Sequence, residues 1–374
     1  MSHQKHAKIT KRNNGIYAPN EVSILGVKCG VISDLVNDLA KRLQGVAKTA
    51  YVDASHASDI EAPVLDVFTF HKSGNLETNV DFQLNKFNSR IQLSQYDLTF
   101  INGNHYPGNK QIIVLDPEKE ASITKRIDEI TDIKFFIKST SDAVVFDVLK
   151  EKFSGIDSIP VYELDDIDGI FSEVQKLIEV PDIQSVILAG GLSSRMGTDK
   201  GLLEYHGKAQ RTYMYELLQD IFPVVDEGQK GVYISTRQHQ DVPGNTIVDK
   251  FKGLGPFGAI CSAFQENPNT AWLVLATDLP FVDENLIRLL ISKRNPAKVA
   301  TAIKGKNKEF PEPLITIWEP KSYPILLSYL AQGYSCPRKI LINADVELVE
   351  VDDSIIQNIN TPEEFQQAKK DLNQ

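Results

Sequence analysis

A glycine-rich loop with two cations is the strongest chemical signal in the sequence. It reads Leu188-Ala-Gly-Gly-Leu-Ser-Ser-Arg-Met-Gly-Thr-Asp-Lys200 and begins inside the apolar run Ser185–Ala189. Gly190 and Gly191 let the backbone approach a ligand closely and direct successive N–H groups into one concavity. Arg195 and Lys200 add positive charge that can neutralise a polyphosphate. Because the G-x-x-x-x-G-K-[ST] spacing is absent, the pattern predicts a phosphate-binding loop that differs from a Walker A loop.

A second signal is an acid just beyond another apolar run. Asp278 follows Trp272–Ala276 after one intervening residue. In open α/β sheets, ligands bind at the edge where the parallel strands end. Mg²⁺ takes one or two carboxylates and completes its coordination with phosphate oxygens and water. Together with the glycine loop, Asp278 is therefore predicted to be the ligand of a magnesium ion.

The segments that would position these groups alternate between strand-like and helix-like patterns. Apolar runs such as Val232–Ser235 alternate with helix-like stretches such as Tyr213–Ile221, which is typical of a parallel sheet with crossover helices. The first half shows the same alternation, and Glu179–Asp182, with its proline, interrupts it. We therefore predict two three-layer α/β domains, at residues 21–180 and 183–374, after a flexible N-terminal segment at residues 1–20.

The glycine-rich loop resembles a known signature. Leu188–Lys200 is similar to L-A-G-G-x-S-x-R-M-G-x-D-K, the motif of the molybdenum cofactor guanylyltransferases, which are MobA-type nucleotidyltransferases. Every fixed position is met, and the resemblance continues in order through most of Ser185–Ala368. It implies a Rossmann-like nucleotidyltransferase fold for the C-terminal domain. It also implies transfer of GMP from GTP to molybdopterin, with release of pyrophosphate and with Mg²⁺ as the cofactor.

The resemblance also implies roles for single residues. The nucleotide would be held by Leu188, Ala189, Gly190, Gly191 and Lys200, and the catalytic residues would be Arg195, Lys200 and Asp278. Asp249, ahead of Gly253–Gly258, is similar to the family's aspartate that accepts hydrogen bonds from guanine. Asn358 and Asn360 are similar to the asparagines of N-x-N-T-P-E-E, which the family uses near the pterin.

Simpler interpretations stay open for part of this set. Asp249 could be a surface turn residue. The stretch Thr361–Glu364 is a good helix start in its own right, with a capping threonine followed by proline and glutamate. Arg338, in a segment where substrate-facing loops are expected, either meets the substrate phosphate or is an ordinary surface arginine.

One position that bears on the choice of base departs from the family pattern. The family usually has an asparagine near the end of the second strand, where this chain has Ile234 or Ser235. A cytidylyltransferase acting on the same pterin is therefore the nearest enzymatic alternative, although Gly191 and Asp199 favour guanylyl transfer. A non-catalytic carrier that delivers the finished cofactor is an alternative from another class, and the complete loop signature opposes it.

The N-terminal half resembles, more weakly, the MobB-type GTP-binding adaptor over roughly residues 21–180. Gly26-Val-Lys-Cys-Gly-Val-Ile-Ser33 lies between a strand and a helix, as a P-loop does. However, Val31 stands at the second glycine position and Ile32 at the lysine position, and isoleucine cannot pair with a triphosphate. We expect a degenerate P-loop-like domain that docks another molybdenum cofactor assembly protein or an apo-molybdoenzyme and does not turn over nucleotide.

Composition excludes several other functions. The 40 Lys and Arg residues against 50 Asp and Glu give a formal net charge of -10, so nucleic acid is not an expected partner. No apolar run reaches the ~18–20 residues that cross a bilayer. The 3 cysteines are widely spaced and form neither a disulfide framework nor a zinc cluster. We therefore expect a cytoplasmic protein without a membrane partner.

Overall fold

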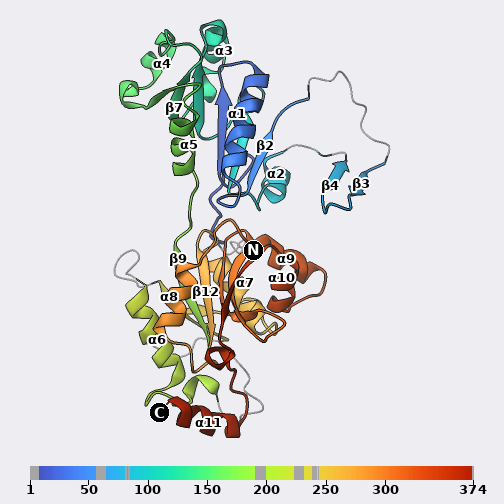
Figure 1. The fold of residues 1–374 in the computed structure, drawn as a ribbon, viewed down its shortest axis with the longest axis vertical. Helices are drawn as coiled ribbons and strands as arrows, with labels where there is room; N and C mark the ends of the chain where they lie inside the picture. The colour runs from blue at the N-terminus through green and yellow to red at the C-terminus, as the bar shows by residue number, and fades with distance from the viewer. Residues whose placement is uncertain are drawn as a thin grey trace, which may run out of the picture. The chain divides into compact units, whose positions relative to one another are not determined.

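The computed structural model describes residues 8–55, 65–80, 82, 85–189, 199–222, 231–237, 242 and 244–372 (Figure 1). Within them the chain forms two compact units. One is Asn13–Glu179, and the other begins at Val180 and includes the residues before Asn13. Each unit has helices on both faces of its own sheet, which confirms the predicted fold class. No described helix has both the length and the apolar character needed to cross a membrane.

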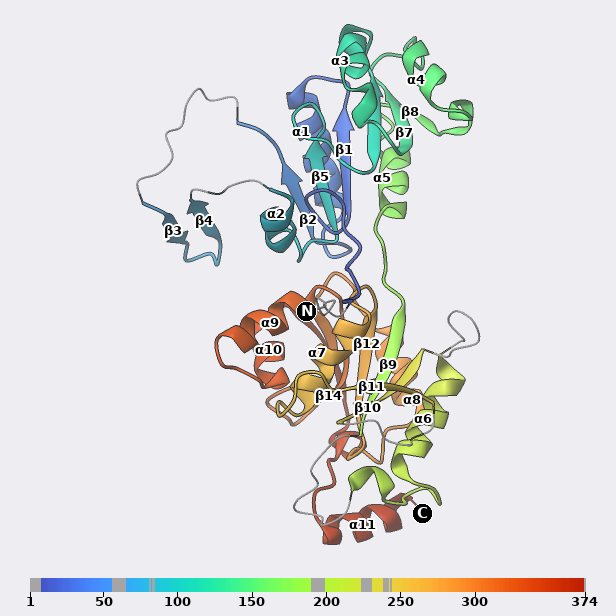
Figure 2. The same cartoon turned by 180° about the vertical axis from the view of Figure 1, so that it is seen from behind.

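A six-stranded parallel sheet forms the centre of the N-terminal unit (Figure 2). Its strands, in sheet order, are β2 (Thr49–Val52), β5 (Leu98–Asn102), β1 (Glu21–Leu25), β6 (Gln111–Leu115), β7 (Ile133–Lys138) and β8 (Val161–Glu163). The helices are α1 (Cys29–Arg42), α2 (Lys86–Gln92), α3 (Glu120–Lys125), α4 (Asp147–Lys152) and α5 (Ile167–Lys176). Buried residues of α1 and α5 pack on one face of the sheet, and those of α3 and α4 pack on the other.

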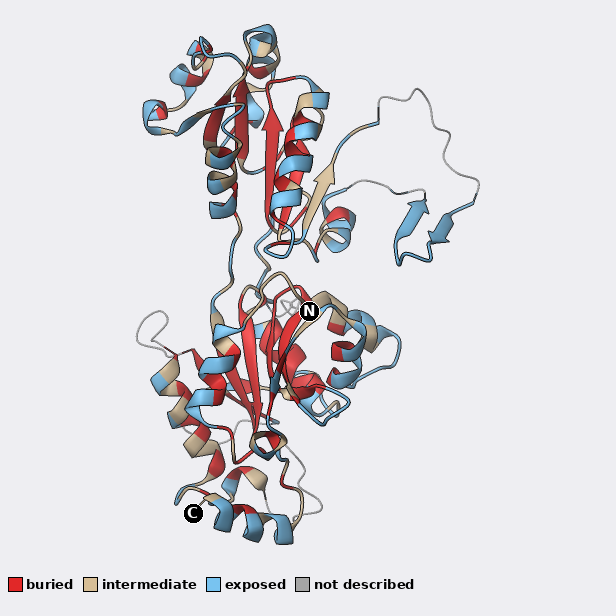
Figure 3. Cartoon of the chain, in the orientation of Figure 1, coloured by how far each residue is buried: buried red, intermediate tan, exposed pale blue. Residues whose placement is uncertain are grey.

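One strand-like apolar run of the first half lies outside this sheet. The described part of the run at Val64–Phe70 forms β3 (Val67–Phe70), which pairs only with β4 (Leu76–Asn79) in a two-stranded antiparallel sheet. All residues of both strands are exposed (Figure 3). The run is strongly apolar, but no second layer covers it within the described part of the chain.

The loop between β1 and α1 has the context of a P-loop but not its chemistry. Gly26 adopts a φ of +95°, a conformation that favours glycine, and lets the chain turn from the strand into the helix. Ile32, at the lysine position, is fully buried in the core cluster with Leu35 and Leu39. The side chain at this position therefore belongs to the packing of α1 on the sheet and cannot reach a phosphate.

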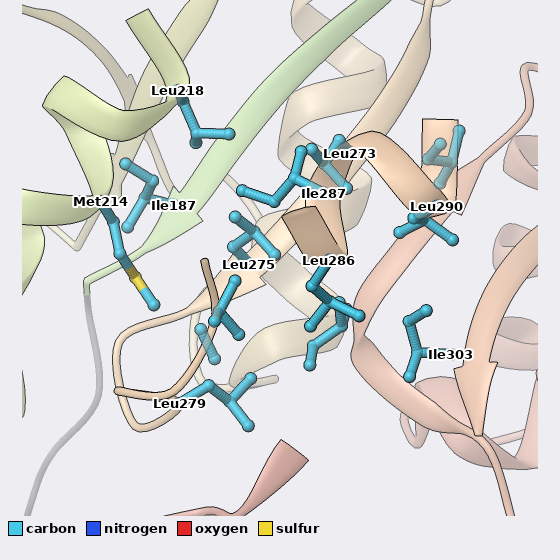
Figure 4. Close-up of a cluster of buried hydrophobic side chains, with 14 of the residues drawn as sticks. Ile187, Met214, Leu218, Leu273, Leu275, Leu279, Leu286, Ile287, Leu290 and Ile303 are labelled. Atoms are coloured by element: carbon cyan, nitrogen blue, oxygen red, sulfur yellow. The ribbon is translucent and has the colours of Figure 1, made fainter. Parts of the chain in front are cut away.

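The C-terminal unit is built on a seven-stranded sheet. Its strands, in sheet order, are β11 (Asn245–Val248), β10 (Val232–Thr236), β9 (Ile183–Leu188), β12 (Ala271–Ala276), β14 (Glu312–Trp318), β13 (Ala300–Gly305) and β15 (Val346–Val351). The helices are α6 (Gln210–Ile221), α7 (Pro256–Glu266), α8 (Glu284–Ser292), α9 (Ser322–Ala331), α10 (Pro337–Asn343) and α11 (Pro362–Leu372). Figure 4 shows how α6 and α8 close one face, where Met214, Leu218 and Ile287 meet Ile187 and Leu275 of the sheet. The other face is covered by α7, α9 and α10.

The strand β14 runs against its neighbours. It pairs antiparallel with β12, with Leu275 opposite Ile315, whereas β9, β10, β11 and β12 are mutually parallel. The alternation in the sequence predicts a parallel sheet and does not reveal this reversal. Its consequence is that the beginning of β14, at Glu312, lies at the same edge of the sheet as the end of β12.

Candidate active site

The site lies at the edge of the C-terminal sheet where the four parallel strands end. Leu188 ends β9 and Ala189 follows it, and both are buried. The Ala189 N–H donates to the Ser235 carbonyl of β10 at 3.3 Å, and Thr277 Oγ1 donates to the Leu188 carbonyl at 3.5 Å. Leu188 and Ala189, which form the stem of the glycine loop, are thus anchored to the strands on either side. This stem lies at the carboxyl ends of the parallel strands, where open α/β sheets bind ligands.

Three predicted residues from distant segments meet beside this stem. Lys200 Nζ lies 2.8 Å from Asn360 Oδ1 and 3.3 Å from Asp278 Oδ2. Lys200 opens a 3-10 helix at Lys200–Leu202, and Asp199 caps this helix by accepting a hydrogen bond from the Gly201 N–H. The side chains of Lys200 and Asp278 are 18% and 20% exposed. The ion pair is therefore shielded from bulk water yet open enough to contact a ligand.

Asp278 fits a magnesium ligand. Its Oδ1 is buried and has no hydrogen-bond partner among the described residues. A buried carboxylate oxygen without a donor is costly, and a cation bound to it would offset that cost. No described cluster of three or more His, Cys, Asp or Glu residues could hold a metal by itself. This donor set suits Mg²⁺, which uses one or two carboxylates together with substrate phosphates and water.

A helix start places Asn360 in the site. Glu364 Oε2 accepts hydrogen bonds from the N–H groups of Asn360 and Thr361, at 2.6 and 3.1 Å, and the Glu364 N–H donates to Thr361 Oγ1 at 3.2 Å. This is a capping box at the beginning of α11. The Ile359 N–H also donates to the Asp278 carbonyl at 2.8 Å. These bonds hold the segment 358–360 against the loop that carries Asp278.

Asp249 stands at the same edge, farther along the sheet. It follows β11, which is three strands from β12, so the ends of these strands lie about 14 Å apart at the usual spacing of about 4.8 Å. Its Oδ1 accepts from the Phe251 N–H at 2.9 Å and from the Ser262 hydroxyl at 3.0 Å. These bonds orient the carboxylate without using Oδ2. A nucleotide extended along the edge can therefore place its phosphates near Asp278 and its base near Asp249.

The remaining predicted residues fall into two groups. Gly190, Gly191 and Arg195 lie outside the described residues. Asn358 is described but lines a cleft of about 550 Å³ on the side of β14 and α11, and Asn360 is not among the residues that line this cleft. The two asparagines, which the family resemblance places together near the pterin, therefore have different surroundings.

Glu312 is a site residue that sequence reasoning misses. Its side chain is 10% exposed, lines the same cleft and has its Oε2 3.7 Å from Arg338 Nη2. Burial raises the pKa of the Glu312 carboxyl, and the negative charge of Asp278 raises it further. The sequence signal is an acid at the start of an apolar strand. It points to the site only once β14 is known to run antiparallel.

The raised pKa of Glu312 predicts a dependence of stability on pH. A carboxyl whose pKa is higher in the folded than in the unfolded state stabilises the fold below its ordinary pKa, and this contribution is lost as the pH rises through the raised value. The hydrogen bond from the Leu314 N–H and the cations Arg338 and Lys308 oppose this shift without cancelling it. Glu312→Gln, which stays neutral, should therefore melt above the wild type near pH 8 and approach it near pH 4. Thermal unfolding across this range measures the difference, and a Glu312→Gln variant that melts lower at pH 8 would contradict it.

Comparison with known proteins finds a family match within the C-terminal unit. Residues 185–347 match the family described as MobA-like NTP transferase domain. The "Molybdenum cofactor biosynthesis bifunctional protein" of Synechocystis is 33% identical over 191 residues, which are 50% of this chain and 53% of that protein. The chain thus spans about half the length of this relative. The "Probable molybdenum cofactor guanylyltransferase" of Flavobacterium johnsoniae is 26% identical over 186 residues, 49% of this chain and 94% of that protein.

A solved structure also resembles the chain. The molybdopterin-guanine dinucleotide biosynthesis protein A from Archaeoglobus fulgidus is 22% identical, with a TM-score of 0.43, over 51% of this chain and 98% of that one. The family match rests on the sequence comparison. The match of residues 185–347 to the MobA-like NTP transferase domain agrees with the family that the loop signature predicts.

Proposed function

We propose that this chain, which carries a MobA-like NTP transferase domain at residues 185–347, transfers GMP from GTP to molybdopterin and releases pyrophosphate. The observation that carries the proposal is the cluster of Lys200, Asp278 and Asn360 beside the stem of the glycine loop. A cation and a carboxylate at the carboxyl edge of the sheet are the groups that a magnesium-bound triphosphate requires. Relatives named as molybdenum cofactor guanylyltransferases support the choice of substrates.

The reaction requires that the two substrates are positioned and that the charge of the phosphates is neutralised. An oxygen of the molybdopterin phosphate attacks the α-phosphorus of GTP, and pyrophosphate leaves, so no protein nucleophile is needed. Mg²⁺ held by Asp278 would neutralise phosphate charge when bound. Lys200 offsets the charge that grows on the α-phosphate and on the leaving group. Gly190, Gly191 and Arg195 complete the phosphate loop in this proposal, with Leu188 and Ala189 as its stem.

The assay for this function compares two nucleotides. The purified protein, molybdopterin and MgCl₂ should release pyrophosphate with GTP and release far less with CTP. Equal or faster release with CTP would instead identify the cytidylyltransferase. Tight binding of the finished dinucleotide with no pyrophosphate from either nucleotide would identify a carrier.

Asp249 is proposed to read the guanine base. The bonds from Phe251 and Ser262 fix its Oδ1, and Oδ2 is then placed to accept from the N1–H and the amino group of guanine. Asp249→Asn replaces an acceptor by a donor, so we expect the ratio of kcat/KM for GTP over CTP to fall about 10- to 100-fold. Steady-state kinetics with both nucleotides measure this ratio. Glu266→Gln, an exposed acid near the end of α7, is the control and should leave the ratio unchanged.

The N-terminal unit is proposed to dock another molybdenum cofactor assembly protein or an apo-molybdoenzyme. Burial of Ile32 where a P-loop has its lysine argues against nucleotide turnover in this unit, and docking is the role that we propose in its place. We therefore expect calorimetric titration of the full chain with GTP and Mg²⁺ to give one site per chain. Two sites per chain would contradict this role. The three free cysteines suit a reducing cytoplasm, where we place the reaction.

A further inference from the structure

The cleft beside the phosphate site is lined by more acidic than basic side chains. Its volume is about 550 Å³, within the usual range for small-molecule sites. Its ionisable lining groups are four acids and two bases, namely Glu309, Glu312, Glu364, Asp371, Lys308 and Arg338. Acids in this excess repel a triphosphate, which belongs instead beside Lys200. A ring that presents hydrogen-bond donors would be attracted to the same surface.

Glu312 is the most buried ionisable group of this cleft and is held in a fixed orientation. Its Oε1 accepts a hydrogen bond from the Leu314 N–H at 3.2 Å. Its Oε2 has no hydrogen bond within the described part of the chain, and Arg338 Nη2, at 3.7 Å, is beyond hydrogen-bonding distance. A carboxylate fixed through one oxygen presents the other as an acceptor. Such an acceptor discriminates strongly, because a ligand that lacks the matching donor leaves it unpaired.

The cleft also has an aromatic wall. Phe310 lines it, and its side chain remains exposed although it is large and apolar. A planar heterocycle can stack on such a ring, as nucleic-acid bases do on aromatic side chains. The cleft adjoins the phosphate site through the segment 358–360, in which Asn358 lines the cleft and Asn360 contacts Lys200. A ligand in the cleft can therefore extend a phosphate toward the reaction centre.

From this geometry we infer that Glu312 selects the acceptor, by accepting hydrogen bonds from the ring N–H and amino donors of a pterin that stacks on Phe310. The inference rests on the proposed function, since it assigns the acceptor of that reaction. It names a specificity residue for the pterin and leaves the nucleotide to Asp249 and the glycine loop.

Binding of fluorescent pterins to the full chain tests this assignment without catalysis. The probes are 6-hydroxymethylpterin and 6-hydroxymethyllumazine, in which an oxo group replaces the 2-amino donor. The wild type should bind the pterin about 10- to 100-fold more tightly than the lumazine, as expected for one hydrogen bond to a charged group. In Glu312→Gln this preference should disappear, while the affinity for GTP stays unchanged. Phe310→Ala should weaken both probes together.

A matched control removes the same charge elsewhere in the cleft. Glu309 is exposed, so Glu309→Gln should keep the wild-type preference for the pterin. Circular dichroism confirms that each variant is folded. A wild type that binds the two probes equally, or a Glu312→Gln variant that keeps the preference, would overturn the inference. The proposed function fails separately, if GTP and molybdopterin yield no pyrophosphate while the pterin preference is present.

Discussion

Lys200→Ala should lower the rate of pyrophosphate release about 10²- to 10³-fold, the loss expected when one contact to developing charge is removed. Lys200 Nζ is held between Asn360 Oδ1 and Asp278 Oδ2, so the lysine side chain does not have to rearrange when the nucleotide binds. A charge fixed in advance stabilises the transition state without reorganisation. The measurement is single-turnover pyrophosphate release at saturating GTP and molybdopterin.

The control for this variant is another lysine of the same unit. Lys208 pairs with Glu216 on the surface and is 45% exposed. Lys208→Ala removes the same charge from the unit and should leave turnover within a factor of about two, as surface substitutions usually do. If Lys200→Ala turns over at the wild-type rate, Lys200 has no part in the chemistry.

Asp278→Asn should lower turnover by about 10³-fold or more, because it removes the only predicted protein ligand of the metal. A metal ion at transferring phosphates supplies several kcal/mol of charge stabilisation, and each 1.36 kcal/mol is tenfold in rate. Asparagine keeps the shape of the side chain, so the fold should tolerate the change. The affinity of Mn²⁺ for the protein–GTP complex, followed by electron paramagnetic resonance, should fall in parallel.

An exposed acid provides the comparison for Asp278. Asp345 is 66% exposed and pairs with Lys298. Asp345→Asn should bind Mn²⁺ and turn over as the wild type does. Wild-type Mn²⁺ affinity in Asp278→Asn would show that the metal is held elsewhere.

The architecture and part of the site follow from local sequence patterns. The runs that become β9 and β12 are short and apolar, and acids or glycines follow them, so both the strands and their functional ends can be predicted. The capping box at Thr361–Glu364 is similarly local, since all its contacts lie within a few residues. The fold of the C-terminal unit follows from the family resemblance of the loop.

Features that depend on pairing between distant segments could not be predicted. The sequence of β14 does not reveal that this strand runs antiparallel to β12. Only the pairing of the two strands brings Glu312 to the edge where Asp278 lies. The contact of Lys200 with Asn360 likewise joins residues that are 160 positions apart. The apolar run at β3 is also ambiguous, because its pattern fits a core strand while its partner, β4, lies outside the main sheet.

A crystal structure with GTP and MgCl₂ tests the central claim most directly. We expect triphosphate density beside Lys200, a metal ion on Asp278 Oδ1 and guanine directed toward Asp249. Nucleotide bound instead at the Gly26 loop of the N-terminal unit, with no density around Lys200 and Asp278, would contradict it.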